Sequence, residues 1–213
     1  STVGSPANAP WVTSVGASYF NRLYLSEITL QASGGTTLTG LYGGTTTPGI
    51  DNFTLTDAAG VPDSEGDSSG ACGAPFNPGA FQANTAVLCE RRGLAPTWVQ
   101  GNFVNAGGAG AVILYNSAYG YDFNSYLHPL PAVVVLNATG LQIKQFIAAH
   151  PGERIAVSFT HAAPVYAPDP RIPVDTVAGF SSRGPNFNAS SGQLLDVLKP
   201  DVTAPGLQVL AGA

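Results

Sequence analysis

Serine, histidine and acidic residues could together form a nucleophilic triad, but none of them lies at a motif spacing. Ser181 and Ser182 lie in the run GFSSRG, which misses the G-x-S-x-G nucleophile elbow by one residue. The three histidines lie in His-Pro or loop contexts without a recognisable partner: His128, His150 and His161. A triad is defined by geometry, so spacing alone leaves it open. We expect these serines and histidines to be structural.

Acidic residues alternate in a segment rich in Gly and Ser. Asp63, Glu65 and Asp67 follow the spacing of the first ligands of an EF-hand loop. The sixth position of that loop holds Ser68 instead of Gly, and the twelfth holds Ala74 instead of Glu. We therefore expect a solvated acidic loop rather than a calcium site, and no metal or cofactor for the chain.

The two cysteines, Cys72 and Cys89, are 17 positions apart. They lack the Cys/His clustering of a zinc site and the C-x-x-C spacing of a redox motif. In a chain rich in Ser, Thr, Asn and Gly, we expect them to form a disulfide, which stabilises by about 3 kcal/mol for a loop of this size. Two unrelated buried thiols are the alternative.

Three N-x-[ST] sequons occur, at Asn52, Asn137 and Asn188. They permit surface glycosylation only in a eukaryotic protein. A few sequons are expected by chance in a chain of this composition, so they are weak evidence by themselves.

Composition limits the broad class of protein. The chain has 213 residues, of which 44% are hydrophobic and only 10% charged, with a net charge of −5. It has no basic stripe for a phosphate backbone, so nucleic-acid binding is disfavoured. The apolar runs Ala111–Tyr115 and Ala132–Leu136 are far shorter than the roughly 20 residues of a membrane span. The chain contains no Met and no N-terminal signal pattern, and we interpret it as a piece of a larger protein.

The middle of the chain alternates strand-like and helix-like segments. Strands are predicted over Thr85–Glu90, Gly110–Tyr115, Ala132–Leu136 and Arg154–Thr160. One helix is predicted over Pro96–Ala106, with the apolar residues Trp98, Val99, Phe103 and Val104 at helical spacing. A second is predicted from a cap at Thr139 to Ala149, with Leu141, Ile143, Phe146 and Ile147 on its apolar face. This order predicts an α/β fold, with a mixed, mostly parallel sheet and two flanking helices.

Three other segments have distinct patterns. Leu23–Gly40 alternates apolar and polar residues around a turn, which is typical of an antiparallel hairpin. Asp51–Gly70 is acidic and is predicted to be an exposed loop. Aromatic residues gather among Asn, Ser and Gly after the second buried strand: Tyr115, Tyr119, Tyr121, Phe123 and Tyr126. They form either an interaction loop or a loop packed on its own domain.

The two ends of the chain, Ser1–Ser18 and about Pro164–Ala213, are short strand-and-turn segments dense in Pro and Gly. They carry little core material of their own. We interpret them as pieces of one domain into which the middle is inserted.

Both ends resemble the subtilisin-like serine proteases. FSSRGP at Phe180–Pro185 and LKPDVTAPG at Leu198–Gly206 resemble, in this order, the stretch that leads to the family's nucleophilic serine. APWVTSVGAS at Ala9–Ser18 is similar to the strand that follows the oxyanion-hole Asn. The residues that carry the two C-terminal motifs are Phe180, Ser181, Ser182, Arg183, Gly184, Pro185, Lys199, Pro200, Asp201, Pro205 and Gly206.

The middle resembles the protease-associated (PA) domain that many large subtilases insert between those strands. The matching segments are Ala86–Gly93, Asn105–Asn116, Leu130–Val135 and Gly140–Ile143. The resemblance implies three parts: an N-terminal flank of the catalytic domain over residues 1–26, a PA domain over 27–161, and a C-terminal flank over 162–213.

The resemblance implies a fragment of a secreted serine endopeptidase, acting outside the cell. Its PA domain would modulate substrate access or protein–protein contacts. The family's catalytic Asp and His, its oxyanion Asn and its nucleophilic Ser match no residue here, so the chain alone is expected to be inactive. The implied partners are protein or peptide substrates of the parent protease and the remainder of the catalytic domain. A stand-alone PA-type interaction module is the alternative.

Overall fold

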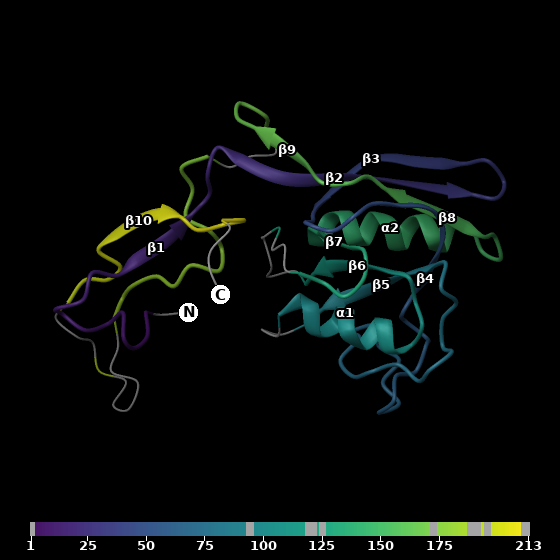
Figure 1. The fold of residues 1–213 in the computed structure, drawn as a ribbon, viewed down its shortest axis with the longest axis horizontal. Helices are drawn as coiled ribbons and strands as arrows, with labels where there is room; N and C mark the ends of the chain where they lie inside the picture. Colours follow the sequence, from purple (N-terminus) through teal and green to yellow (C-terminus); the bar gives the residue numbers. More distant parts are fainter. Residues whose placement is uncertain are drawn as a thin grey trace. The chain divides into compact units, whose positions relative to one another are not determined.

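The computed structural model describes residues 3–92, 96–117, 123, 127–170, 174–186, 193 and 197–209. The chain divides into two compact units. Unit 1 consists of Ser1–Leu23 and Val165–Ala213, and unit 2 is the continuous segment Tyr24–Pro164 (Figure 1).

Unit 2 is built on a mixed sheet of eight strands. The strands are β2 (Arg22–Ala32), β3 (Thr37–Gly44), β4 (Ile50–Asp57), β5 (Thr85–Arg91), β6 (Ala111–Asn116), β7 (Ala132–Val135), β8 (Ile155–Phe159) and β9 (Ala163–Tyr166). Their order is β3-β7-β6-β5-β4-β8-β2-β9, and an additional β2–β3 pairing closes all of them except β9 into a barrel. The expected α/β fold with a mixed sheet and two helices is therefore present.

The sequence predicted a mostly parallel sheet, but more of the strand pairs described in this sheet are antiparallel than parallel. β4, β5, β6 and β7 pair in parallel, but β2–β3, β3–β7, β4–β8 and β2–β8 are antiparallel. The difference arises because the predicted hairpin, which forms β2 and β3, joins the same sheet as the parallel strands. β8 then fits between β2 and β4 and runs antiparallel to both.

The apolar runs form strands that are buried on both faces. Along β5, Leu88 belongs to one hydrophobic cluster, whereas Val87 and Cys89 belong to a second cluster on the opposite face. β6 alternates in the same way, with Ile113 in the first cluster and Leu114 in the second. Strands covered on both sides explain why the sequence shows continuous apolar runs there.

Helices cover the two faces of these central strands. α1 (Thr97–Ala106) packs on β5 and β6, and α2 (Asn137–Ala149) packs on β6 and β3. Figure 1 shows them on opposite sides of the central strands. A side chain at Gly140 of α2 would overlap the Tyr115 ring of β6, so glycine permits this close approach.

The helix period was predicted correctly, but the details of each helix were not. α2 begins at Asn137 after Leu136, without a side-chain cap, so Thr139 is not its cap. Trp98 and Leu141, expected on apolar faces, are 43% and 46% exposed. Val104 is buried as expected, but the other buried residues of α1 are Thr97, Gln100 and Gly101, and the Gln100 side chain donates to the Ala71 carbonyl.

The segment Asp51–Gly70 is not a simple exposed loop. Its first part, through Asp57, lies in β4. Asp63 is buried. Its Oδ1 accepts the backbone N–H groups of Glu65 and Asp67 at 2.9 and 3.0 Å, which compensates the carboxylate for the loss of water. The carboxylate thus organises the turn from inside instead of facing solvent.

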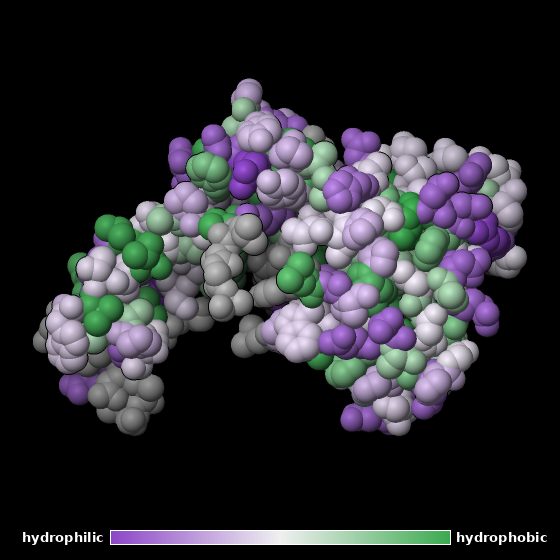
Figure 2. Space-filling view, viewed as in Figure 1, coloured by the Kyte–Doolittle hydropathy of each residue, from purple (hydrophilic) through white to green (hydrophobic). Residues whose placement is uncertain are grey.

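Unit 1 contains a two-stranded parallel sheet. β1 (Val15–Ser18) pairs with β10 (Val202–Pro205), so segments from the two ends of the chain share one ladder. Val3, Tyr19, Ala178 and Leu207 are buried in this unit, whereas other large apolar side chains are exposed, with Trp11 at 83% and Leu198 at 92%. Hydrophobic residues, green in Figure 2, lie among polar ones on the visible surface of unit 1.

Within the described residues, no helix has the length and apolar character needed to cross a membrane.

Candidate functional site

The motif residues Lys199 and Asp201 join the two segments of unit 1. The Lys199 ammonium donates to the Val12 carbonyl at 2.6 Å and to Asp201 Oδ2 at 2.7 Å. The same Asp201 oxygen accepts the Ser14 N–H at 2.7 Å. The Lys199 side chain is only 2% exposed, so these are charge-assisted bonds with little competition from water. We call this set, Val12, Ser14, Lys199 and Asp201, the flank clamp.

The flank clamp also affects ionisation. The hydrogen bond from Lys199, followed by that from the Ser14 backbone, holds the pKa of Asp201 below its usual value. The carboxylate form is the one that accepts both bonds, so the clamp is fully formed above the usual aspartate pKa.

Ser181, in the FSSRGP motif, joins the same two segments. Its Oγ accepts the Ala17 N–H of β1 at 2.9 Å, and the residue is 8% exposed. Its backbone N–H donates to the Ala178 carbonyl. The hydroxyl oxygen of Ser181 thus satisfies a backbone donor of β1.

The other residues of the two motifs lie around these bonds. Phe180 is 44% exposed, and Arg183, Gly184 and Pro185 are exposed. Ser182, Arg183, Gly184 and Pro200 line a shallow pocket of about 380 Å³ beside Ser181. Gly206 lies against Ala17 of β1, where a side chain would overlap it. The motifs thus shape the packing between the two flanks.

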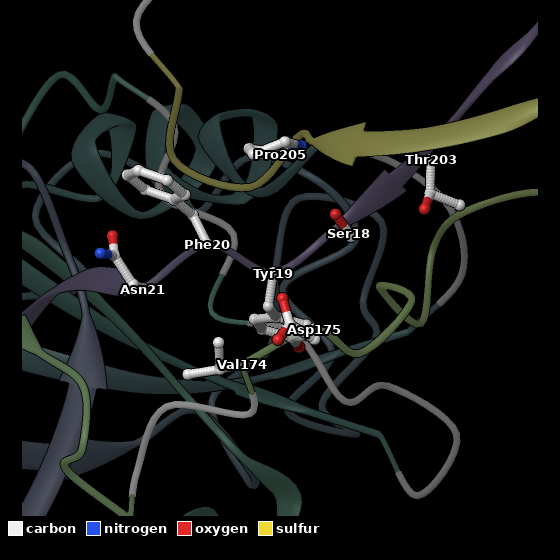
Figure 3. A pocket seen from close by; sticks show the side chains of 8 residues that line it. All are labelled: Ser18, Tyr19, Phe20, Asn21, Val174, Asp175, Thr203 and Pro205. Atoms are coloured by element: carbon white, nitrogen blue, oxygen red, sulfur yellow. The ribbon is translucent and has the colours of Figure 1, made fainter.

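A second pocket of unit 1, of about 410 Å³, opens where β1 and β10 end. Its described lining consists of Ser18, Tyr19, Phe20, Asn21, Val174, Asp175, Thr203 and Pro205 (Figure 3). A serine and a carboxylate are present, but no histidine is among these residues. The described lining therefore brings together no Ser-His-Asp arrangement.

The three histidines all lie in unit 2, and their described contacts do not include a serine or a carboxylate. His128 is largely buried, and burial lowers its pKa to about 4. Its Nε2 lies 3.3 Å from Thr97 Oγ1 on α1, and its buried Nδ1 has no hydrogen-bond partner among the described residues. His150 Nδ1 contacts the Phe146 carbonyl at 2.8 Å, and His161 is exposed.

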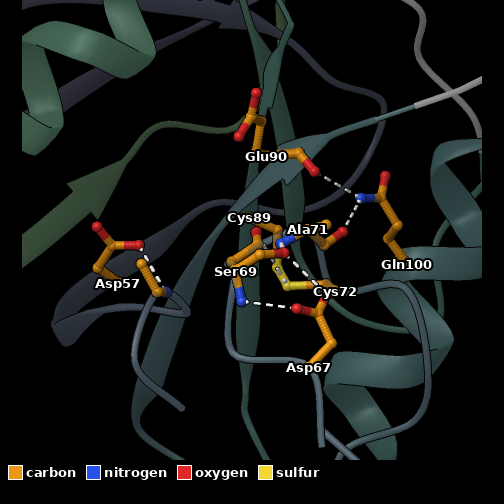
Figure 4. Close-up of a disulfide and its surroundings, with 10 residues drawn as sticks. Asp57, Asp67, Ser69, Ala71, Cys72, Cys89, Glu90 and Gln100 are labelled. Atoms are coloured by element: carbon orange, nitrogen blue, oxygen red, sulfur yellow. Dashed lines mark hydrogen bonds between the residues drawn. A yellow bond between two sulfur atoms is a disulfide. The ribbon is translucent and has the colours of Figure 1, made fainter. Parts of the chain in front are cut away.

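The predicted disulfide between Cys72 and Cys89 is present and fixes the acidic loop to β5 (Figure 4). Gln100 of α1 reinforces this attachment by donating to the carbonyls of Ala71 and Glu90 at 2.7 and 3.1 Å. No sequence pattern predicted this role for Gln100, a polar residue on the inward face of a helix. The alternative of two unrelated thiols is wrong.

The carboxylates of the acidic loop accept hydrogen bonds from within the loop. The Asp63 carboxylate faces backbone donors, whereas Asp67 accepts the Ser69 N–H and hydroxyl, and these bonds lower the pKa of Asp67. Among the described residues, no three His, Cys, Asp or Glu side chains are grouped closely enough to hold a metal.

The aromatic segment is placed only in part. Tyr115 and Phe123 are 5% and 4% exposed, and the Phe123 ring lies 5.9 Å from that of Tyr42. These two side chains belong to the interior and not to an exposed loop. Tyr119, Tyr121 and Tyr126 lie outside the described residues, so for them the interaction loop stays a prediction.

Polar side chains gather where the parallel strands end. Lys144 of α2 lies 3.1 Å from Asp57 at the end of β4. Partial burial lowers the pKa of Lys144, but the hydrogen bond and the charge of Asp57 outweigh it, and the net pKa lies above its usual value. Nearby in the sheet, Arg91 donates to Asn116 Oδ1 at 3.3 Å. The cluster stabilises the sheet edge and contains no nucleophile–base pair.

Comparisons with known proteins agree with the motifs of unit 1. The chain is 32% identical over 211 residues to subtilisin-like protease SBT1.4 of Arabidopsis thaliana, and the match covers 96% of this chain. Subtilisin-like proteases SBT1.3 and SBT1.6 of the same plant are 31% and 29% identical over 95% of the chain. The chain is related to the subtilisin-like proteases.

The similarity to these subtilases is limited to one part of each. The chain spans about a quarter of the length of the curated relatives it matches, 24% for SBT1.4 and 25% for SBT1.3. No protein-family model matches the chain.

Solved structures are less similar. A zinc aminopeptidase from Bacillus subtilis aligns with a TM-score of 0.35 at 16% identity, covering 68% of this chain and 34% of that one. An aminopeptidase from Aneurinibacillus sp. aligns with a TM-score of 0.36 at 16% identity, covering 73% and 42%. We draw no conclusion from these values.

Proposed function

We propose that the chain is a segment of a secreted subtilisin-like serine endopeptidase, with unit 1 as part of its catalytic domain and unit 2 as an inserted PA domain. The observation that carries the proposal is the β1–β10 ladder. Two segments separated by the whole of unit 2 pair with each other, and the flank clamp and Ser181 hold them together through the residues that resemble subtilase motifs.

This segment has a supporting role in the proposed endopeptidase. Subtilases use Ser as nucleophile, His as general base, Asp to orient the His, and an Asn side chain at the oxyanion. No residue of this chain matches those positions. Instead, the flank clamp fixes β10, and in the family the nucleophilic serine follows the LKPDVTAPG motif that contains this strand. Correct placement of that serine would then depend on Lys199 and Asp201.

Unit 2 is proposed to modulate access of protein substrates or to contact other proteins. Its two hydrophobic clusters and its disulfide make it a rigid body suited to such a role. The disulfide also supports secretion, because such bonds persist in oxidising compartments.

Two measurements test the proposal. The purified chain should neither hydrolyse a peptide substrate nor react with a fluorophosphonate probe, and labelling of Ser181 or Ser182 would overturn the structural role of these serines. In the parent protease, replacing Tyr24–Pro164 with a short Gly/Ser linker should leave cleavage of a small chromogenic peptide largely intact and change cleavage of a folded protein. Equal effects on both substrates would contradict a role in access.

A further inference from the structure

Asn52 is the first residue of a sequon and lies on a bulge of β4. The register between β4 and β8 shifts between Ile50 and Phe53, and Asn52 adopts a positive φ of 54°. Asn tolerates this left-handed conformation better than most residues. The Ser158 hydroxyl stabilises the bulge by accepting the Asn52 N–H at 2.9 Å and donating to Asp51 at 2.8 Å. The bulge leaves Asn52 exposed although β4 is an inner strand of the sheet.

Arg154 orients the Asn52 side chain by hydrogen bonding to its Oδ1 atom. It donates to Asn52 Oδ1 at 3.1 Å, to the Asn52 carbonyl at 2.8 Å and to Thr54 Oγ1 at 3.0 Å. Within the described residues, no hydrogen bond involves Asn52 Nδ2. The carboxamide is therefore oriented with its oxygen on the protein and its nitrogen available.

Asn137, the second sequon, has the opposite arrangement. It is half-buried at the first residue of α2, and its Nδ2 donates to the carbonyl of Asn116 at 2.9 Å. Asn116 is 1% exposed at the end of β6. A sugar on Asn137 Nδ2 would have to occupy this buried junction between α2 and β6. The third sequon, at Asn188, lies outside the described residues.

We propose that Asn52 is an N-glycosylation site and that the folded chain carries no glycan on Asn137. The donor is a lipid-diphosphate-linked oligosaccharide. Asn52 Nδ2 bonds to the anomeric carbon, the bond from that carbon to the diphosphate oxygen breaks, Nδ2 loses one proton, and the lipid diphosphate leaves. The product keeps the Asn52 Oδ1 acceptor, so the Arg154 bonds are compatible with the modified residue.

The proposal distinguishes two sequons that the sequence treats alike. Asn-Phe-Thr at Asn52 and Asn-Ala-Thr at Asn137 are both complete sequons, and the sequence alone does not separate them. The transferase acts before folding is complete, so Asn137 can be modified in principle. In such a molecule the remaining Nδ2–H can donate to the Asn116 carbonyl only with the sugar packed against the junction between α2 and β6, so we expect this form to be lost from the folded, secreted pool.

To test the proposal, the whole chain is expressed with a secretory signal sequence in a eukaryotic host. The glycan on the secreted chain is the readout, and it is independent of the protease assignment. All chains carry Asn188→Gln, which removes the sequon outside the described residues. The secreted parent chain should show one glycan that peptide:N-glycosidase removes. Release in ¹⁸O-water followed by peptide mass spectrometry should find the labelled aspartate at position 52.

Two variants complete the test. Asn52→Asp keeps an acceptor oxygen for Arg154, tolerates the positive φ and removes Nδ2, so it should abolish the glycan without loss of secretion. Thr139→Ala removes the Asn137 sequon but leaves the Asn137–Asn116 bond, so it should change neither glycan number nor secretion. An unmodified secreted parent chain, or a glycan mapped to Asn137 in folded protein, would overturn the proposal.

Discussion

The folds of unit 1 and unit 2 are stabilised by different interactions. Unit 2 buries two aliphatic clusters on the two faces of its central strands, and burial of apolar area is the dominant favourable term in folding. Unit 1 has a two-stranded ladder, the flank clamp and few buried apolar side chains, and it exposes Trp11 and Leu198. The contrast teaches that the inserted unit contains its own driving force for folding, whereas the unit that carries the subtilase motifs depends on a few polar bonds.

The largest difference between the two units should appear when each is produced as a separate chain. A chain of residues 24–164 should fold cooperatively, with a single denaturant transition and an intact disulfide. Residues 3–23 and 165–209 joined by a short linker should show no cooperative transition, because a small apolar core cannot offset the loss of chain entropy. Circular dichroism against urea measures both. A cooperative transition in the joined flanks would remove the contrast.

Removing the disulfide should weaken unit 2 alone. Cys72→Ala with Cys89→Ala frees the acidic loop from β5 and should lower the free energy of unfolding of excised unit 2 by about 3 kcal/mol. Urea unfolding of the variant and the parent measures the difference. Reductant should destabilise the parent by a similar amount and leave the variant unchanged; a variant as stable as the parent would show that the bond contributes nothing.

Acid should also destabilise unit 2, through His128. Burial holds its pKa at about 4 in the folded state, below the usual 6.5, so the unfolded chain binds the proton more readily. The contribution of neutral His128 is complete above pH 6.5 and should fall by about 3 kcal/mol as the pH drops to about 4.

The pH dependence can be assigned to this residue by substitution. His128→Asn should flatten the profile of unfolding free energy between pH 6.5 and 4. His161→Asn, the same substitution at an exposed histidine, is the control. Equal slopes in the parent and His128→Asn would contradict the assignment.

Breaking the flank clamp should affect unit 1 and not unit 2. Lys199→Met keeps the apolar stem but removes the charge-assisted bonds to Val12 and Asp201, which should cost about 2 kcal/mol. Hydrogen exchange should increase at the amides of β1 and β10 in the whole chain. Arg183→Met, at an exposed motif residue, is the control. Faster exchange in the unit 2 strands would show that the clamp is not confined to unit 1.

The ion pair between Lys144 and Asp57 should matter least. Both side chains are partly exposed, at 33% and 20%, and such pairs contribute little in water. Lys144→Gln should lower the free energy of unfolding of unit 2 by about 0.5 kcal/mol. Asp57→Ala should cost more, because it also removes the acceptor of the Ala59 N–H at 2.9 Å. A larger loss for Lys144→Gln would contradict this ranking.

Local patterns predicted the elements of unit 2 well. The apolar runs became β5, β6 and β7, and the alternating residues around the Gly34 turn became the β2–β3 hairpin. Both helices formed close to their predicted bounds. These signals depend on residues adjacent in the sequence, where periodicity is informative.

Features that depend on tertiary contacts were missed. Besides the predicted β2–β3 hairpin, closure of the barrel requires β2 to pair with β8 and β3 to pair with β7, which no local pattern specifies. Asp63 and Gln100 have residue types typical of the surface, yet each is buried. Asp63 accepts backbone N–H groups of its own turn, and the Gln100 amide nitrogen donates to the carbonyls of Ala71 and Glu90. The motif that carries Lys199 and Asp201 indicated a protease relative, but the bonds they make across the ladder could not be read from the sequence.

The closed barrel also bears on self-association. An open sheet exposes rows of free N–H and C=O groups along its outer strands, and these are templates for aggregation. In the described part of unit 2, only β9 lies outside the ring, and Pro164 removes one of its N–H groups. At the high protein concentrations of a crowded compartment, unit 2 should therefore resist aggregation through strand pairing between molecules.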